Sequence, residues 1–174
     1  SEDGNGYNTA IGWSTLKNLN AGANGYNTAV GSDSGRGMTS GINNTLVGAE
    51  SGHDISSGTG NTFLGAYAGN KTDDGASNVA VGYNALGGNC GDHNTAVGSG
   101  SLATATGSQN TAVGENSGKL SVGTRNVFVG VDAGELATST DDCVMIGHSA
   151  GGGATLTGHD NVLIGKEAGH DLTS

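Results

Sequence analysis

The stretch Asn94-Thr95-Ala96-Val97-Gly98 occurs ten times along the chain, in this form or a close variant. The glycines that close the ten copies are Gly12, Gly31, Gly48, Gly65, Gly82, Gly98, Gly114, Gly130, Gly147 and Gly165. Successive closing glycines are 16–19 residues apart, and so steady a period indicates one small unit stacked on itself. The sequence therefore predicts an all-β, parallel β-solenoid of ten coils of 16–19 residues. We expect a single repeat domain over residues 1–174 with no cap at either end.

Charge narrows the classes of partner. Six Lys and Arg residues face sixteen Asp and Glu residues, which gives a net charge of −10. The basic residues are scattered, whereas binding to phosphate backbones needs concentrated positive charge, so we expect no nucleic-acid partner. Apolar runs are far shorter than a membrane span, so we expect no membrane insertion.

An asparagine begins nearly every copy of the repeat. The members of this phase are Asn8, Asn27, Asn44, Asn61, Asn78, Asn94, Asn110, Asn126 and Asn161, with Cys143 in the ninth copy. Identical amides stacked from coil to coil can form a hydrogen-bonded ladder, as they do in cross-β stacks. Asparagine is also a common turn residue, which is the simpler interpretation.

A glycine usually lies three residues before the asparagine, as in Gly41 and Gly58. Asn5 and Asn24 take its place in the first two copies, and Thr140 takes it in the ninth. Since asparagine is the residue that best tolerates positive φ after glycine, the pattern predicts a left-handed backbone corner at this position.

Residues within each short strand alternate between two faces. The residue before the closing glycine is always aliphatic, so we expect it to form the core ladder: Ile11, Val30, Val47, Leu64, Val81, Val97, Val113, Val129, Ile146 and Ile164. The residue before that is apolar too and points the other way, so something must cover it. We expect either a second layer of the same chain or neighbouring chains, and we assign these residues as a chain interface: Ala10, Ala29, Leu46, Phe63, Ala80, Ala96, Ala112, Phe128, Met145 and Leu163.

The repeat resembles those of known fibrous proteins. Asn94-Thr95-Ala96-Val97-Gly98 and Gly82-Tyr83-Asn84-Ala85-Leu86 are similar to repeats of phage tail-fibre proteins and of the YadA-like heads of trimeric autotransporter adhesins. The resemblance covers essentially the whole chain. It implies a left-handed, homotrimeric β-roll used as a shaft or an adhesive head, located outside the cell, on a cell surface or in a virion.

Motifs that would indicate a catalytic or metal-binding site are nearly absent from the sequence. Gly147-His148-Ser149-Ala150-Gly151 matches a nucleophile-elbow pattern, but its glycines and Ala150 are repeat residues, so we expect no catalytic residue and no enzyme. The acidic links match no calcium motif, and the histidines share no ligand spacing, so we expect no metal site and no cofactor. Trp13, Tyr67 and Tyr83 fall in non-consensus positions after closing glycines. They are candidate surface-binding residues for sugars, although packing over a coil corner would equally explain them.

The sequence thus favours a non-catalytic fibre segment or adhesive head of a phage tail fibre or bacterial surface adhesin. Its expected partners are copies of itself and a cell-surface glycan or protein receptor. One alternative is an extracellular filament subunit that stacks end to end, because strand edges at uncapped solenoid ends can pair. Another is an ice-binding solenoid that uses the threonine column Thr9, Thr28, Thr45 and Thr62.

Overall fold

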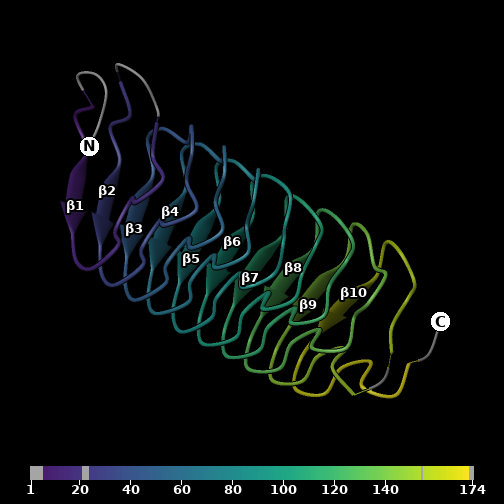
Figure 1. Ribbon diagram of the computed structural model, residues 1–174. Helices are drawn as coiled ribbons and strands as arrows, with labels where there is room; N and C mark the ends of the chain where they lie inside the picture. Colours follow the sequence, from purple (N-terminus) through teal and green to yellow (C-terminus); the bar gives the residue numbers. More distant parts are fainter. Residues whose placement is uncertain (1–5, 21–23, 154, 173–174) are drawn as a thin grey trace.

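A computed structural model describes residues 6–20, 24–153 and 155–172 of the 174-residue chain. Ten short strands form one parallel sheet in which each strand pairs with the next along the chain (Figure 1). The strands are β1 (Thr9–Ile11), β2 (Thr28–Val30), β3 (Thr45–Val47), β4 (Thr62–Leu64), β5 (Val79–Val81), β6 (Thr95–Val97), β7 (Thr111–Val113), β8 (Val127–Val129), β9 (Val144–Ile146) and β10 (Val162–Ile164). No helix forms among the described residues, so the predicted all-β parallel solenoid is confirmed.

Equivalent residues of neighbouring repeats pair directly across the sheet. Between β6 and β7, for example, Thr95 pairs with Thr111 and Val97 pairs with Val113. The same register holds along the whole stack, whether the link between two strands is longer or shorter. Because stacked strands lie ~4.8 Å apart, the nine steps from β1 to β10 make a sheet about 43 Å long.

The middle residue of each strand points into the solenoid. In β2 to β9 this residue is fully buried within the single chain. Its members are Ala29, Leu46, Phe63, Ala80, Ala96, Ala112, Phe128 and Met145. Leu163 packs against the same core, and Ala10 is exposed in the outermost strand. The assignment of these ten residues as an interface between chains is therefore wrong, because eight of them lie in the chain's own core and Leu163 packs against it.

The predicted core ladder is wrong for the same reason, since it occupies the outward side of the strands. None of its members is buried: Ile11, Val30, Val47, Leu64, Val81, Val97, Val113, Val129, Ile146 and Ile164. Ile11 and Ile164 are exposed by 59% and 66%. Branched aliphatic side chains favour strands on any half-covered sheet surface. Their constancy in the repeat therefore indicates the strand and does not tell inside from outside.

Large and small side chains alternate across the narrow interior. Phe63 faces Gly69 on the opposite wall of its coil, where an added Cβ would collide with the phenyl ring. At Ala80 and Ala96 the position six residues later is a buried leucine, Leu86 or Leu102, whereas at Ala29 and Ala112 it is Gly35 or Gly118, and large side chains of neighbouring coils reach in. The interior is thus filled by a large side chain from one wall, from the other wall or from a neighbouring coil, as close packing requires.

The closing glycines turn the chain sharply at the end of each strand. Their φ angles lie between +126° and +139°, a region that other residues rarely adopt. In the first nine copies an added Cβ would also lie under 3.0 Å from the carbonyl oxygen of the next closing glycine. Glycine is therefore required here both by backbone conformation and by the approach of the next coil.

The glycines at the predicted left-handed corner serve a different purpose. Neither Gly41 nor Gly58 has positive φ, nor does Asn24, and Asn5 lies outside the described residues. The prediction of a left-handed corner here is wrong. A Cβ on Gly41 would instead lie 2.7 Å from the Gly58 carbonyl oxygen in the next coil. Close stacking of backbones, not turn conformation, selects glycine at this position.

Exchanging the large side chain between the two walls tests this packing. Phe63→Ala should lower the free energy of unfolding by about 3–5 kcal/mol, because it leaves a cavity. Gly69→Leu alone should also destabilise, because the new side chain collides with Phe63. The double variant Phe63→Ala/Gly69→Leu should recover much of the loss, since Leu86 occupies the same position at a φ of 54°. A double variant as unstable as the sum of the two single variants in chemical denaturation would contradict the wall-to-wall packing.

Candidate functional site

A ladder of buried asparagines runs along one corner of the solenoid. Each backbone N–H donates to the side-chain oxygen of the asparagine in the preceding coil, as from Asn44 to Asn27 and from Asn61 to Asn44, both 2.9 Å. From Asn27 to Asn126, each side-chain amide donates to the corner carbonyl of the next coil, as from Asn61 to Gly75 over 2.8 Å. Amide-to-amide bonds join some steps, as between Asn44 and Asn27. The predicted ladder is confirmed, and its buried polar groups are hydrogen bonded, as burial requires.

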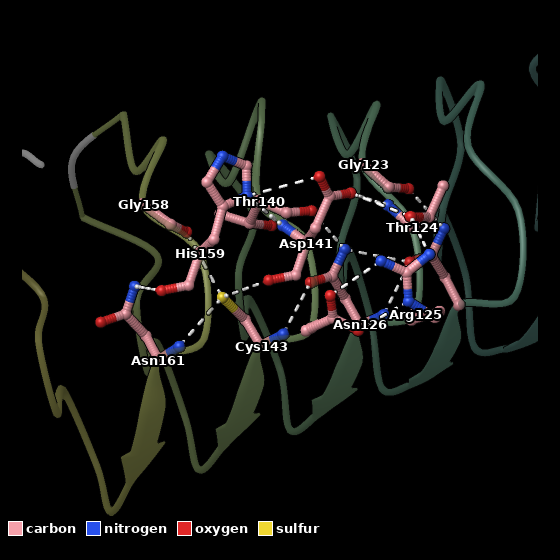
Figure 2. A network of polar contacts seen from close by, with 12 residues as sticks. Gly123, Thr124, Arg125, Asn126, Thr140, Asp141, Cys143, Gly158, His159 and Asn161 are labelled. Carbon is pink, nitrogen blue, oxygen red and sulfur yellow. Dashed lines mark hydrogen bonds and ion pairs between the residues drawn. The ribbon is translucent and has the colours of Figure 1, made fainter.

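Cys143 replaces asparagine in the ninth coil without interrupting the ladder (Figure 2). Its backbone N–H still donates to the Asn126 side-chain oxygen, 3.0 Å away. Its sulfur accepts the Asn161 backbone N–H at 3.4 Å and lies 3.4 Å from the Gly158 carbonyl oxygen. A thiol is a weaker donor and acceptor than an amide, so this step is the weakest of the ladder. Beside it, the Thr140 hydroxyl is buried with no hydrogen-bond partner, which adds a further cost.

Charged side chains tie the eighth coil to the ninth, one step before this weak step (Figure 2). Arg125 binds both carboxylate oxygens of Asp142 in the next coil, at 2.6 and 2.7 Å. The Asp141 carboxylate accepts hydrogen bonds from the backbone N–H and hydroxyl of Thr124, which lower the pKa of Asp141. The hydrogen-bonded Arg125 guanidinium likewise lowers the pKa of Asp142. These groups bind one another, so the network acts as a tether between coils.

The largest candidate surface is the outward side of the ten strands, which we call the outer sheet face. One of its columns consists of Thr9, Thr28, Thr45, Thr62, Val79, Thr95, Thr111, Val127, Val144 and Val162. The other column is the aliphatic series from Ile11 to Ile164 described above. None of these twenty side chains is charged, although the whole chain carries a net charge of −10. An uncharged and mostly apolar strip this long is typical of an interaction surface.

The two ends of the outer sheet face differ in chemistry. Over β1 to β4 one column is threonine throughout, and the hydroxyls of Thr28, Thr45 and Thr62 have no hydrogen-bond partner among the described residues. Over β8 to β10 both columns are aliphatic. The hydroxyls at the first end can order water or hydrogen bond to polar groups. The aliphatic side chains at the second end are stabilised most by contact with a surface that excludes water.

The predicted surface-binding aromatics all lie beside the outer sheet face, on the turns that follow the strands. Trp13 and Tyr83 are exposed by 69% and 61%, which confirms their surface position. Tyr67 and Tyr83 pack edge to face with ring centroids 5.7 Å apart. A second aromatic pair was not predicted from the sequence: Tyr7 stacks on Tyr26 with ring centroids 5.1 Å apart, and both residues precede a ladder asparagine in adjacent coils.

The nucleophile-like serine lies on an exposed turn after β9. Its hydroxyl is 3.2 Å from Nδ1 of the adjacent His148, and the segment that follows Ser149 is a turn and not a helix. Within the described part of the chain, no group of three His, Cys, Asp or Glu side chains is arranged to hold a metal ion.

Neither a protein-family model, nor a curated protein, nor a solved structure matches this chain. No helix long and apolar enough to cross a membrane is found in the described ranges. The assignment of function therefore depends on the surfaces described above.

Restoring the amide at the weak step of the ladder tests its contribution. Cys143→Asn should raise the free energy of unfolding by about 1 kcal/mol, because an amide replaces weak sulfur contacts to Asn161 and Gly158. The reverse change one coil earlier, Asn126→Cys, is the matched control and should destabilise. If both variants unfold at the wild-type denaturant concentration, the ladder does not stabilise the stack.

Proposed function

We propose that the chain is a non-catalytic structural segment of an extracellular fibre or adhesive head, in which the outer sheet faces of several copies pack together. The observation that carries this proposal is the uncharged, mostly aliphatic outer face of ten in-register strands, left exposed in the single chain. The resemblance of the repeat to tail-fibre and adhesin repeats supports the same role in a phage tail fibre or on a bacterial surface.

Charge favours a second copy of this chain as the occupant of the face. Copies that each carry a net charge of −10 repel one another wherever their charged sides meet. The outer sheet face carries no charge, so copies can approach there without that penalty. Burial of the exposed Leu64, Ile146 and Ile164 would contribute roughly 25 cal/mol for each Å² removed from water.

The size of the face favours three copies over two. The strip is about 43 Å long, from the strand spacing, and ~10 Å wide, from three residues at ~3.3 Å each, so it offers on the order of 400 Å². A stable pair buries about 800 Å² on each partner. In a closed trimer each chain contacts two others and buries the flanks of its face as well, which supports the homotrimer implied by the resemblance.

A charge placed on the face should separate the copies without unfolding them. We expect wild-type protein to have the mass of a trimer by light scattering, and Val113→Lys to be a folded monomer, since Val113 is 39% exposed in the single chain. Val122→Lys is the matched control, because Val122 is an exposed valine outside the sheet and should leave the trimer intact. A monomeric wild type, or a trimeric Val113→Lys, would contradict the proposal.

Ice binding is a second candidate, and one observation favours it. The threonine column of β1 to β4 faces outward on an uncharged sheet face, and the hydroxyls of Thr28, Thr45 and Thr62 have no partner among the described residues. Such an array could order water at the spacing of the strands. The large exposed aliphatic side chains in the neighbouring column favour dry contact instead.

Thermal hysteresis separates the two candidates. We expect no hysteresis from wild-type protein or from monomeric Val113→Lys, because packing between copies is the proposed use of the face. Hysteresis that Thr45→Lys abolishes and Val122→Lys leaves unchanged would show that ice is the occupant of the face.

A further inference from the structure

The turns beside the outer sheet face bear a continuous column of residues, one from each coil. In the first five coils this column is Trp13, Ser32, Ala49, Ala66 and Tyr83. We call it the aromatic margin. The next residue of each coil donates its backbone N–H to the column residue of the coil before, as from Asp33 to Trp13 over 2.8 Å and from Tyr67 to Ala49 over 2.9 Å. The five residues are therefore in register along the stack.

The aromatic margin has a large exposed ring at each end and small residues between. Trp13 and Tyr83 are four coils apart, which at ~4.8 Å per coil separates their backbones by about 19 Å. Ser32, Ala49 and Ala66 offer no side chain large enough to obstruct the strip between the rings. A chain-like ligand lying along the stack could contact both rings at once.

Polar groups lie beside the strip and are held in place. Asn70 donates its side-chain N–H to the Glu50 carbonyl oxygen at 3.2 Å and to the Glu50 carboxylate at 3.4 Å. The nearby Glu50 carboxylate raises the pKa of the Tyr67 phenol, both by its charge and by accepting a hydrogen bond from the phenol. The Tyr67 ring in turn packs edge to face against Tyr83. A carboxylate, an amide and a phenol thus sit next to an exposed aromatic platform.

This combination matches the chemistry of a sugar. A pyranose has an apolar face of C–H groups that can stack on an aromatic ring, and a rim of hydroxyls that can bind carboxylates and amides. Tyrosine and tryptophan give such contacts at low cost in conformational entropy, because their side chains have few rotatable bonds. Asp33 and Glu50 border the strip and the chain is strongly acidic, so an anionic sugar would be repelled.

We propose that the aromatic margin binds a neutral oligosaccharide that lies along the stack between Trp13 and Tyr83, with Glu50 accepting hydrogen bonds from its hydroxyls. The inference rests on the adhesive role proposed above and names the ligand class for it. One exposed strip gives weak binding, and a trimer that presents three strips to a cell surface gains avidity.

Trp13 is the only tryptophan in the chain, so its fluorescence reports on one end of the strip. Wild-type protein is titrated with neutral cello-, chito-, malto- and manno-oligosaccharides and with sialylated oligosaccharides, by fluorescence and by calorimetry. We expect at least one neutral series to bind saturably and the sialylated sugars not to bind. Tyr83→Ala and Glu50→Gln should each weaken binding by about tenfold, the loss expected for one good contact. Tyr26→Ala removes an exposed ring that precedes its strand, lies outside the aromatic margin and should have no effect.

Several results would overturn the inference. One is that no neutral series binds. Another is that the Tyr83→Ala and Glu50→Gln variants bind as tightly as the wild type. A third is that the sialylated sugars bind more tightly than the neutral ones. The same titrations on monomeric Val113→Lys separate this inference from the proposed assembly. Sugar binding by a wild-type protein that remains monomeric would sustain the site and reject the assembly, whereas a wild-type trimer that binds no sugar would do the reverse.

Discussion

The buried asparagine ladder is the interaction on which the rest of the structure depends. Each strand is only three residues long, too short to fix its own register. The ladder supplies the missing constraint, because every step joins a backbone N–H to the side-chain oxygen one coil earlier at 2.8–3.0 Å as far as Cys143. With the asparagine fixed, the next three residues always enter the sheet in the same phase. The outer sheet face and the aromatic margin are continuous for this reason.

Because the ladder fixes the register of the coils, side chains can pack inside each coil while the surface residues vary from coil to coil. The interior accepts one large side chain per coil where Phe63 faces Gly69, or where Leu86 stands opposite Ala80. Repeat lengths from 16 to 19 residues are tolerated, because the extra residues lie in the links between the strands and outside the ladder. The surface can therefore change from coil to coil while the stack stays intact. Trp13, Tyr67, Tyr83 and Glu50 occupy such variable positions, and this is where we place recognition.

The sequence was enough to predict the solenoid, the number of strands and the ladder, because those features repeat in every copy. It misled on which side of the strand is inside. A three-residue strand that is apolar at both alternating positions offers no contrast in polarity, and Val97 was as plausible a core residue as Ala96. Size variation was the informative signal: the inward position ranges from alanine to phenylalanine to match its surroundings, whereas the outward one stays branched. The contact of Glu50 with Asn70 and Tyr67 spans different coils and left no trace in the repeat.

The central claim is that the strands present their branched side chains outward, as a face that copies of the chain then cover. Thiol labelling of adjacent positions tests it most directly, with Cys90→Ser and Cys143→Asn removing the native thiols. In the monomeric state at low concentration, we predict that Val113→Cys reacts rapidly with maleimide and Ala112→Cys does not, because Val113 is exposed and Ala112 is buried. In the concentrated oligomer both should be protected. Rapid labelling at position 112 with protection at position 113 in the monomer would contradict the orientation of the sheet, and equal labelling of Val113→Cys at all concentrations would contradict its role in assembly.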